Sequence, residues 1–260
     1  MKARSAISIQ RDVIFAIFLR EMNARFKSYT FGNIWIILEP LLMISVFLVL
    51  FGARGRGEFG YVEPPVFILA GFLPFRTLWQ ATMRKNMSAL GGAKGLLGFR
   101  QVRLFDIFMA RSLVEGGIFL VSGTALVLIM MWLGFAPLPN DPLFMLFYAA
   151  HLWLFAIFFG ILACVIASIA REVEKLVNLF TMPLMFVSAV FYPMTIVPAR
   201  YQDLMALNPL VHASELIREA WLPGYISPVA SYEYLFVWIL ILSALAVSAY
   251  RLRWQRMLAR

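Results

Sequence analysis

Long apolar runs separated by short polar segments dominate this chain. A helix needs roughly 20 residues to cross a hydrocarbon layer of about 30 Å, and each run is about that long or longer. The pattern therefore predicts an all-α integral membrane protein with six transmembrane helices. The expected spans cover residues 33–52, 64–83, 107–134, 143–170, 176–197 and 234–251.

Residues 1–30 precede the first run and carry too many charges to cross lipid. Helical spacing places apolar and polar residues on opposite sides of this segment, which favours an amphipathic helix in the membrane interface. The alternative is a core-facing helix of a small soluble cap. The chain then divides into this helix and a membrane domain at 31–260. The apolar side holds Phe15, Phe18, Leu19, Met22 and Phe26, and the polar side Asp12, Arg20, Asn23 and Lys27.

The connection after the fifth run mixes apolar stretches with breakers such as Asn208-Pro209 and Pro223-Gly224. It holds too few apolar residues for a full crossing. Two short re-entrant or surface helices at about 198–225 fit better, because irregular backbone is tolerated at membrane depth only beside protein or water. Pro183 and Pro193 also interrupt the fifth run, and each removes a backbone donor, so a kink is expected there.

The positive charges sharpen this topology. Eighteen of the 23 Lys and Arg residues lie in four segments on one side of the expected spans. Positive loops stay in the cytoplasm, so both termini are expected there. The net charge of +9 sits beside the spans, which indicates membrane lipid rather than nucleic acid as the partner. The four segments are residues 1–30, 84–111, 171–175 and 251–260.

Charged residues inside apolar runs are candidates for function, because each costs about 2.5–3.5 kcal/mol at the centre of a lipid-facing span. Arg111 and Glu115 are four residues apart and can pair on one helix face, with a direct transport role as the alternative. Glu39, followed by Pro40, is interpreted as an anchor for a neighbouring helix, with substrate contact as the alternative. Arg76 has no partner close in sequence, which favours a polar pathway.

Aromatic residues surround Arg76 on the second run. Phe72, Phe75 and Trp79 share this run, and Tyr61 lies just before it. Aromatic faces and a cation together suit sugar rings and acidic groups. The cluster therefore predicts a substrate pathway, with an ordinary aromatic belt as the alternative.

The sequence lacks the motifs for ATP hydrolysis, metal binding and disulfide formation. No GxxxxGK[ST] loop is present, so ATP is not expected to be hydrolysed by this chain. His151 and His212 are the two histidines, and neither stands in HExxH or another metal-binding spacing. Cys164 is the sole cysteine, which excludes an intrachain disulfide. We expect no catalytic residues, no metal site and no cofactor in this chain.

The cytoplasmic connection at 84–106 combines glycines, apolar residues and cations. A compact helix between two turns, at about 86–104, is expected. Its apolar side chains with basic neighbours suit docking in a groove of a soluble partner, and the alternative is a loop resting on lipid headgroups. The candidate docking residues are Leu96, Leu97, Phe99, Arg100 and Arg103.

Several short segments of this chain form one ordered set of motifs. They are Leu19-Arg20-Glu21 with Arg25-Phe26, GNIWIILEP at 32–40, Gly71 with Pro74-Phe75, Phe99-Arg100, Ala110-Arg111 with Glu115, and NPLVHASELIREAWLPGY at 208–225. Taken together, these segments resemble the membrane permeases of bacterial capsular polysaccharide ABC exporters of the KpsM type, which are related to O-antigen and teichoic acid permeases. The resemblance covers nearly the whole chain, and Arg76 departs from the family pattern.

The resemblance implies a homodimer in the bacterial inner membrane, with two ATP-binding cassette subunits that hold ATP and Mg. It implies a lipid-linked acidic polysaccharide as cargo, and periplasmic capsule-export proteins as further partners. The 86–104 segment then resembles a coupling helix, the N-terminal helix a cytoplasmic gate, and 198–225 the outer gate helices. The implied gating or structural residues are Arg20, Glu21, Arg25, Glu39, Pro40, Arg111, Glu115, Asn208, Pro209, His212, Glu215, Arg218 and Glu219.

Three other functions stay open on the sequence. One is a permease for O-antigen or teichoic acid, which the motifs separate only partly from a capsule permease. Another is a membrane glycosyltransferase acting on lipid-linked sugars, although no acidic catalytic cluster is evident. The third is a structural scaffold for a capsule-synthesis complex.

Overall fold

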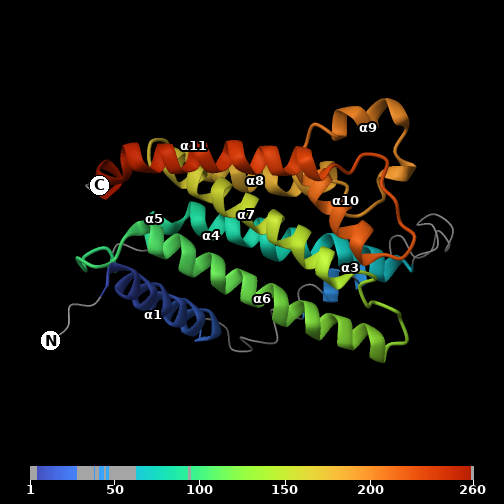
Figure 1. The fold of residues 1–260 in the computed structure, drawn as a ribbon, viewed down its shortest axis with the longest axis horizontal. Coiled ribbons are helices and arrows are strands. Elements are labelled where there is room, and N and C mark those ends of the chain that lie inside the picture. The colour runs from blue at the N-terminus through green and yellow to red at the C-terminus, as the bar shows by residue number, and fades with distance from the viewer. Residues whose placement is uncertain are drawn as a thin grey trace.

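The computed structural model describes residues 5–27, 38, 41–43, 45–46, 63–92 and 95–258. In this part of the chain the regular structure is helical, and the long helices lie roughly side by side along the long axis (Figure 1). The elements are α1 (Ala6–Lys27), α3 (Pro64–Pro74), a π-helix (Phe75–Ala81), α4 (Thr82–Met87), α5 (Ala89–Gly92), α6 (Leu104–Trp132), α7 (Pro142–Ala167), α8 (Glu172–Val187), a 3₁₀ turn (Met194–Ile196), α9 (Ala199–Met205), α10 (Pro209–Trp221) and α11 (Tyr232–Leu258).

The central element is the continuous helical run formed by α3, the π-helix and α4. Pro64 lies at its start, where a missing backbone N–H costs nothing. Every residue from 65 to 75 is buried. Pro74 lies inside the run, and the chain widens into the π-helix directly after it. A proline removes a donor from the helical ladder, so a change of hydrogen-bond register at this point has a physical cause.

Four helical runs among the described residues are long and apolar enough to cross a membrane: Pro64–Met87, Leu104–Trp132, Pro142–Ala167 and Tyr232–Met257. They match the second, third, fourth and sixth expected spans, and the second continues four residues further than expected. Of the first expected span, 33–52, the structure describes residues 38, 41–43 and 45–46, so Glu39 and Pro40 lie outside the described residues. Tyr61, just before the second span, lies outside them as well. The all-helical membrane class is therefore confirmed, whereas six crossings stay a prediction.

The fifth expected span, 176–197, differs most from the structure. Its helix, α8, covers 16 residues from Glu172 to Val187. The helix ends before Ser188. The next residue, Ala189, has a φ of 54°, in the left-handed region that a residue with a Cβ seldom adopts. Pro183 lies within the helix, and the helix ends after Val187 rather than at this proline.

Helix α1 is present as expected, and its placement in the membrane interface stays a prediction. Ile17 is buried, and Val13, Ile14 and Phe18 pack beside it against the bundle. Phe15 and Leu19, which belong to the expected apolar side, are exposed. Apolar residues therefore face both the protein and the surroundings, because α1 must bury one side on α6 and leaves a second apolar side for lipid.

The two connections that the sequence singled out are folded differently from each other. The described residues of this connection, 86–92 and 95–104, do not form the expected compact helix: α4 ends at Met87, α5 lasts four residues, and turns follow at 95–101. The glycines of this segment disfavour a longer helix. At 198–225 the two expected short helices are present as α9 and α10. Their re-entrant placement stays a prediction.

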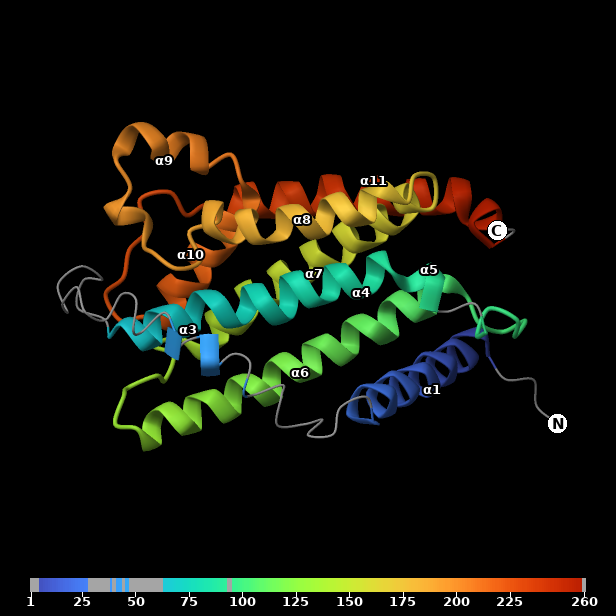
Figure 2. The same cartoon turned by 180° about the vertical axis from the view of Figure 1, so that it is seen from behind.

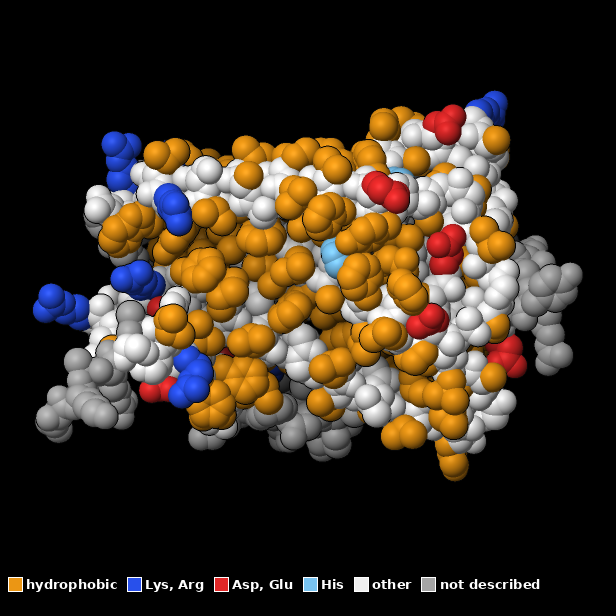
Figure 3. Space-filling model, viewed as in Figure 1, with side chains coloured by type: hydrophobic (Ala, Val, Ile, Leu, Met, Phe, Trp, Pro, Cys, Tyr) orange, Lys and Arg blue, Asp and Glu red, His pale blue; other side chains and the backbone are white. Residues whose placement is uncertain are grey.

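The bundle has two different ends. The beginning of α1, α5 and the end of α11 lie at one end, here named the basic end, and α9 and α10 lie at the other, named the cap end (Figures 1 and 2). Figure 3 shows Lys and Arg gathered chiefly at the basic end, Asp and Glu chiefly toward the cap end, and hydrophobic side chains between them. This distribution is typical of a membrane-spanning bundle.

Candidate functional sites

Two ion pairs attach α1 to α6 at the basic end. Arg25 donates to a Glu115 oxygen, and Arg111 donates to Glu21 over 3.4 Å. The Glu115 side chain is 2% exposed, so its charge depends on the partner from α1. These four residues are here named the α1 anchor. The expected pairing of Arg111 with Glu115 along α6 is wrong, because each side chain finds an opposite charge on the neighbouring helix instead.

Arg111 also connects α6 to the end of the central helical run. Its guanidinium donates to the Lys85 carbonyl over 2.8 Å. A Cβ added to Gly92, at the end of α5, would lie 2.7 Å from the same guanidinium. Arg111 therefore touches α1, α4 and α5 at once, and a movement of any of these elements changes its contacts.

A further link joins α1 to the segment before α6. Gln10 donates to an Asp106 oxygen over 3.0 Å, and the other Asp106 oxygen accepts from the Arg103 backbone N–H, also over 3.0 Å. Asp106 is 1% exposed and holds the first turn of α6. Through this carboxylate the turn at 95–103 is connected to α1.

The expected docking residues split into two groups. Leu96 and Leu97 pack partly against the apolar cluster at the basic end. Phe99, Arg100 and Arg103 are exposed, and Phe99 keeps 64% of its surface accessible. An exposed aromatic ring beside two cations suits contact with a soluble protein.

A cavity of about 1180 Å³, here named the basic vestibule, opens behind this segment. Its lining comes from α4, α5, the turn at 95–103, α6, the end of α7, the start of α8 and the end of α11, and cations outnumber acids among the lining residues. A cavity of this charge attracts anionic groups. The charged lining residues are Lys85, Arg111, Arg171, Lys175 and Glu174.

The described residues of the expected substrate pathway lie inside the bundle rather than along a surface. Phe72, Phe75 and Trp79 are at most 2% exposed, and the Trp79 ring packs on Phe155 and Phe159 of α7. Arg76 does have a partner close in sequence, since it donates to the Gln80 side chain over 2.8 Å. Whether these residues line a pathway stays a prediction.

The cap end holds a buried ion pair, here named the cap hub. Arg218 and Glu215 on α10 are both 0% exposed and 2.8 Å apart. Arg218 also donates to the carbonyls of Ala189 and Val190, at the break after α8, and its guanidinium lies 4.1 Å from the centre of the Phe67 ring. The hub therefore fastens α8 and α3 to α10.

Tyr225 completes the hub by donating to the second Glu215 oxygen over 2.7 Å. Burial is the main reason that the pKa of the Tyr225 hydroxyl is raised above its ordinary value, and the Glu215 charge adds to it. The hydroxyl therefore stays protonated and remains a donor. Arg218 and Tyr225 together satisfy both oxygens of a carboxylate that water does not reach.

The remaining cap residues hold the helix ends together. Asn208 accepts from the Leu210 N–H, with Pro209 at the next position, and donates to Ser188 over 3.0 Å. His212 contacts the Ala206 carbonyl and accepts from the Ser231 N–H, which fixes a neutral ring that donates through Nε2. Glu219 accepts from the Ser227 N–H over 2.7 Å. Burial lowers the pKa of His212 and raises the pKa of Glu219.

Sequence reasoning missed residues whose polar role depends on a distant partner. Gln10 and Asp106 are 96 residues apart, and Asn86 donates to Ser112 over 2.9 Å inside the bundle. Gly160 was also missed: a Cβ there would lie 2.7 Å from the Asn86 Cβ and 3.0 Å from the Met83 carbonyl. Small residues where helices approach closely are a general feature of membrane bundles, and this is the signal available in the sequence.

Comparison with known proteins gives one consistent result. The family model described as "ABC-2 type transporter" matches residues 12–222. The "Polysialic acid transport protein KpsM" of Escherichia coli is 31% identical over 98% of this chain and 99% of its own length. The "Capsule polysaccharide export inner-membrane protein CtrC" of Neisseria meningitidis serogroup B is 28% identical over 88% of this chain and 84% of its own length. BexB of Haemophilus influenzae, with the same description, is 23% identical over 84% of this chain and 82% of its own length.

Proposed function

Because the chain belongs to the ABC-2 type transporter family, we propose that it is the membrane permease of an exporter of capsular polysaccharide. It is a transport subunit of the membrane rather than an enzyme acting alone. End-to-end similarity to capsule-export inner-membrane proteins is the observation that carries the proposal. The apolar belt between the two polar ends agrees with a multi-pass inner-membrane protein (Figure 3).

The cargo in this proposal is a lipid-linked acidic polysaccharide. The basic vestibule supports this choice, because its excess of cations favours anionic groups over neutral glycans. Since the basic end carries most of the Lys and Arg residues, it faces the cytoplasm, and both termini lie there. The cap end then faces the periplasm, where capsule-export proteins receive the polymer.

Energy comes from two separate ATP-binding cassette subunits that hold ATP and Mg, since this chain has no nucleotide-binding loop. The permease works as a homodimer whose two copies enclose the pathway. An exposed apolar stripe on α8 supports a helix-to-helix contact of this kind, although lipid would also cover it. The stripe holds Leu176, Leu179, Phe180, Met182 and Val187.

The contacts at the basic end give this proposal a route from ATPase to gate. An ATPase docked on Phe99 would move the turn at 95–103, and the Gln10–Asp106 hydrogen bond would pass that movement to α1. The α1 anchor would then make different contacts in the two states of the transporter. Such a difference is required, because a partner shifts an equilibrium only by its differential interaction with the two states.

Deletion of the gene in its native host tests the export role. We expect polysaccharide to disappear from the cell surface and accumulate inside the cell, and the intact gene to restore export. Loss of surface polymer without internal accumulation would place the chain in synthesis instead. The class of polymer that accumulates separates capsule from O-antigen and teichoic acid.

A second experiment separates transport from catalysis. The purified chain is mixed with a lipid-linked sugar acceptor and nucleotide sugars, with and without the ATPase. We expect no sugar transfer, and ATP hydrolysis only when the ATPase is present. Sugar transfer by the isolated chain would establish a glycosyltransferase, and intact export in Phe99 variants would favour a scaffold.

A further inference from the structure

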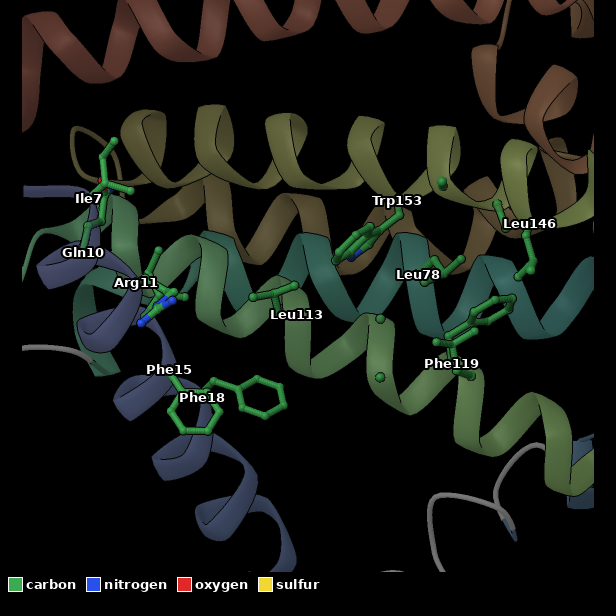
Figure 4. A pocket seen from close by; sticks show the side chains of 16 residues that line it. Ile7, Gln10, Arg11, Phe15, Phe18, Leu78, Leu113, Phe119, Leu146 and Trp153 are labelled. Carbon is green, nitrogen blue, oxygen red and sulfur yellow. The ribbon is translucent and has the colours of Figure 1, made fainter. Parts of the chain in front are cut away.

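An apolar groove of about 810 Å³ lies where α1, α6 and α7 meet. Figure 4 shows Phe15 and Phe18 of α1 at one part of the groove and Phe119, Leu146 and Trp153 along the rest. Along α1 the lining runs from Ile7 to Phe18, which corresponds to about 16 Å at 1.5 Å per residue. The groove is thus elongated, and its shape suits a chain rather than a compact ligand.

We expect the groove to open to lipid rather than to water. Its lining residues Leu113, Leu120 and Leu146 keep 45%, 55% and 43% of their surfaces accessible, and they lie on two membrane-spanning helices. Each buried methylene of an acyl chain contributes about 0.8 kcal/mol. An acyl chain is therefore the favoured filling.

The polar residues of the lining, Gln10 and Arg11, lie near the start of α1, where the groove reaches the basic end. Arg11 belongs to the lining, and its side chain is 81% exposed. It lies 3.5 Å from the exposed Asp12, an arrangement that leaves other guanidinium donors for a phosphate. The charged residue of the lining therefore lies at the basic end, and apolar residues line the groove toward the cap end. A lipid molecule with its headgroup at the basic end matches this distribution.

We propose that this groove is a binding site for one anionic membrane phospholipid, with its phosphate on Arg11 and one acyl chain between α1 and α6. The lipid fills the space beside the α1 anchor, where α1 otherwise holds to the bundle through apolar contacts, two ion pairs and the Gln10–Asp106 hydrogen bond. It thereby stabilises α1 on α6.

Gly117 offers a direct way to block the groove. It belongs to the lining, and a Cβ added there meets no atom within 4 Å, so Gly117→Leu extends into the groove without a clash at its first carbon. Thr124→Leu is the matched control, because Thr124 is exposed on the same helix and does not belong to the lining. Both variants add a leucine to α6 and are required to keep the wild-type melting temperature within a few degrees.

The test uses the full chain in nanodiscs that contain phosphatidylglycerol with a photoreactive acyl chain. We expect crosslinks on α1 and α6 groove residues, a fall of at least about fivefold in Gly117→Leu, and wild-type labelling in Thr124→Leu. One tenfold change in occupancy corresponds to about 1.4 kcal/mol, so a fivefold fall lies within the contribution of a few methylenes. Equal labelling of the two variants would overturn the proposal.

The headgroup is tested with the Arg11→Gln variant. In nanodiscs of phosphatidylglycerol and phosphatidylcholine, the wild type should take the anionic lipid several times more often, and Arg11→Gln should lose this preference while keeping acyl-chain labelling. No preference in the wild type would contradict the phosphate contact. Displacement of the label by a lipid-linked glycan, but not by unlabelled phosphatidylglycerol, would contradict the phospholipid assignment.

Discussion

The cap hub and the α1 anchor both use Arg–Glu pairs, but their surroundings differ. At the cap hub, Arg218 and Glu215 are 0% exposed, and backbone carbonyls, Tyr225 and Phe67 surround them. At the α1 anchor, Arg25 and Glu21 keep 27% and 19% of their side chains accessible. Water does not reach the charged groups of the cap hub, so it cannot replace their partners. Water does reach Arg25 and Glu21 of the α1 anchor, so these side chains can exchange partners. The same chemistry therefore fastens one end of the bundle and leaves the other able to change.

The largest expected effect is on the cap hub. Arg218→Met removes one partner of a fully buried pair and leaves the Glu215 charge without its cation, a change that typically costs about 3–5 kcal/mol. We expect a large fall in the temperature at which the purified protein loses its monodisperse peak. Arg200→Met is the control, because this arginine lies at the exposed start of α9. A similar temperature for both variants would mean that the hub does not fasten the cap.

A smaller effect should come from Gly71→Ala. An added Cβ would lie 2.5 Å from the Val190 carbonyl and still closer to the Arg218 guanidinium, so the hub must shift. Overpacking of this kind typically costs about 1–3 kcal/mol. Gly117→Ala adds the same methyl group where no atom lies within 4 Å. Comparing the two melting temperatures isolates the clash from the change in helix propensity, and equal values would contradict close packing at Gly71.

Charge exchange separates stability from function at the α1 anchor. Arg25→Glu places a second carboxylate beside Glu115, and we expect a loss of about 1–3 kcal/mol, together with reduced export. Reversing both charges, as Arg25→Glu with Glu115→Arg, should recover part of both. Surface polysaccharide and melting temperature are the two measurements. Failure of the double variant to recover more than either single variant would show that the two residues do not act as a pair.

Acidification should loosen the cap slightly. Burial lowers the pKa of His212, so the unfolded state binds more protons as the pH falls below about 6.5, and the free energy of unfolding decreases. Glu219 acts in the opposite sense above its ordinary pKa of about 4.5, because burial raises its pKa and the folded state takes up the proton first. Melting temperatures between pH 8 and pH 5 test this. His212→Gln should flatten the decrease, and Glu219→Gln should steepen it; an unchanged slope in both variants would contradict the assignment.

The sequence predicted what depends on hydrophobic length and charge distribution. The four described crossings needed only the apolar runs, and the asymmetry of Lys and Arg agrees with the basic end of the bundle. The prediction from sequence failed where a contact between residues far apart in the chain determines the structure. Arg111 and Glu115 are spaced to pair, yet oppositely charged residues of α1 lie closer.

The break at Ala189 is another such case, because apolar residues continue past it and the sequence therefore predicted a longer span. The carbonyls exposed by the break are satisfied by Arg218, which lies 29 residues later. The spacing of residues within one helix cannot predict a partner such as Arg218, which lies on another helix.

The smallest expected effect on stability, and the sharpest test of the difference between the two ends, is Phe99→Ala. Phe99 is 64% exposed, so its removal should change the free energy of unfolding by less than about 0.5 kcal/mol. If the turn at 95–103 receives the ATPase, the same variant should weaken stimulation of ATP hydrolysis by the permease and reduce surface polysaccharide. Leu128→Ala removes an equally exposed apolar side chain, 60% accessible, from the membrane-facing side of α6 and should leave both activities unchanged. A variant that melts like the wild type but no longer exports separates coupling from folding. Full export in Phe99→Ala would contradict the coupling role of this turn and favour the scaffold alternative.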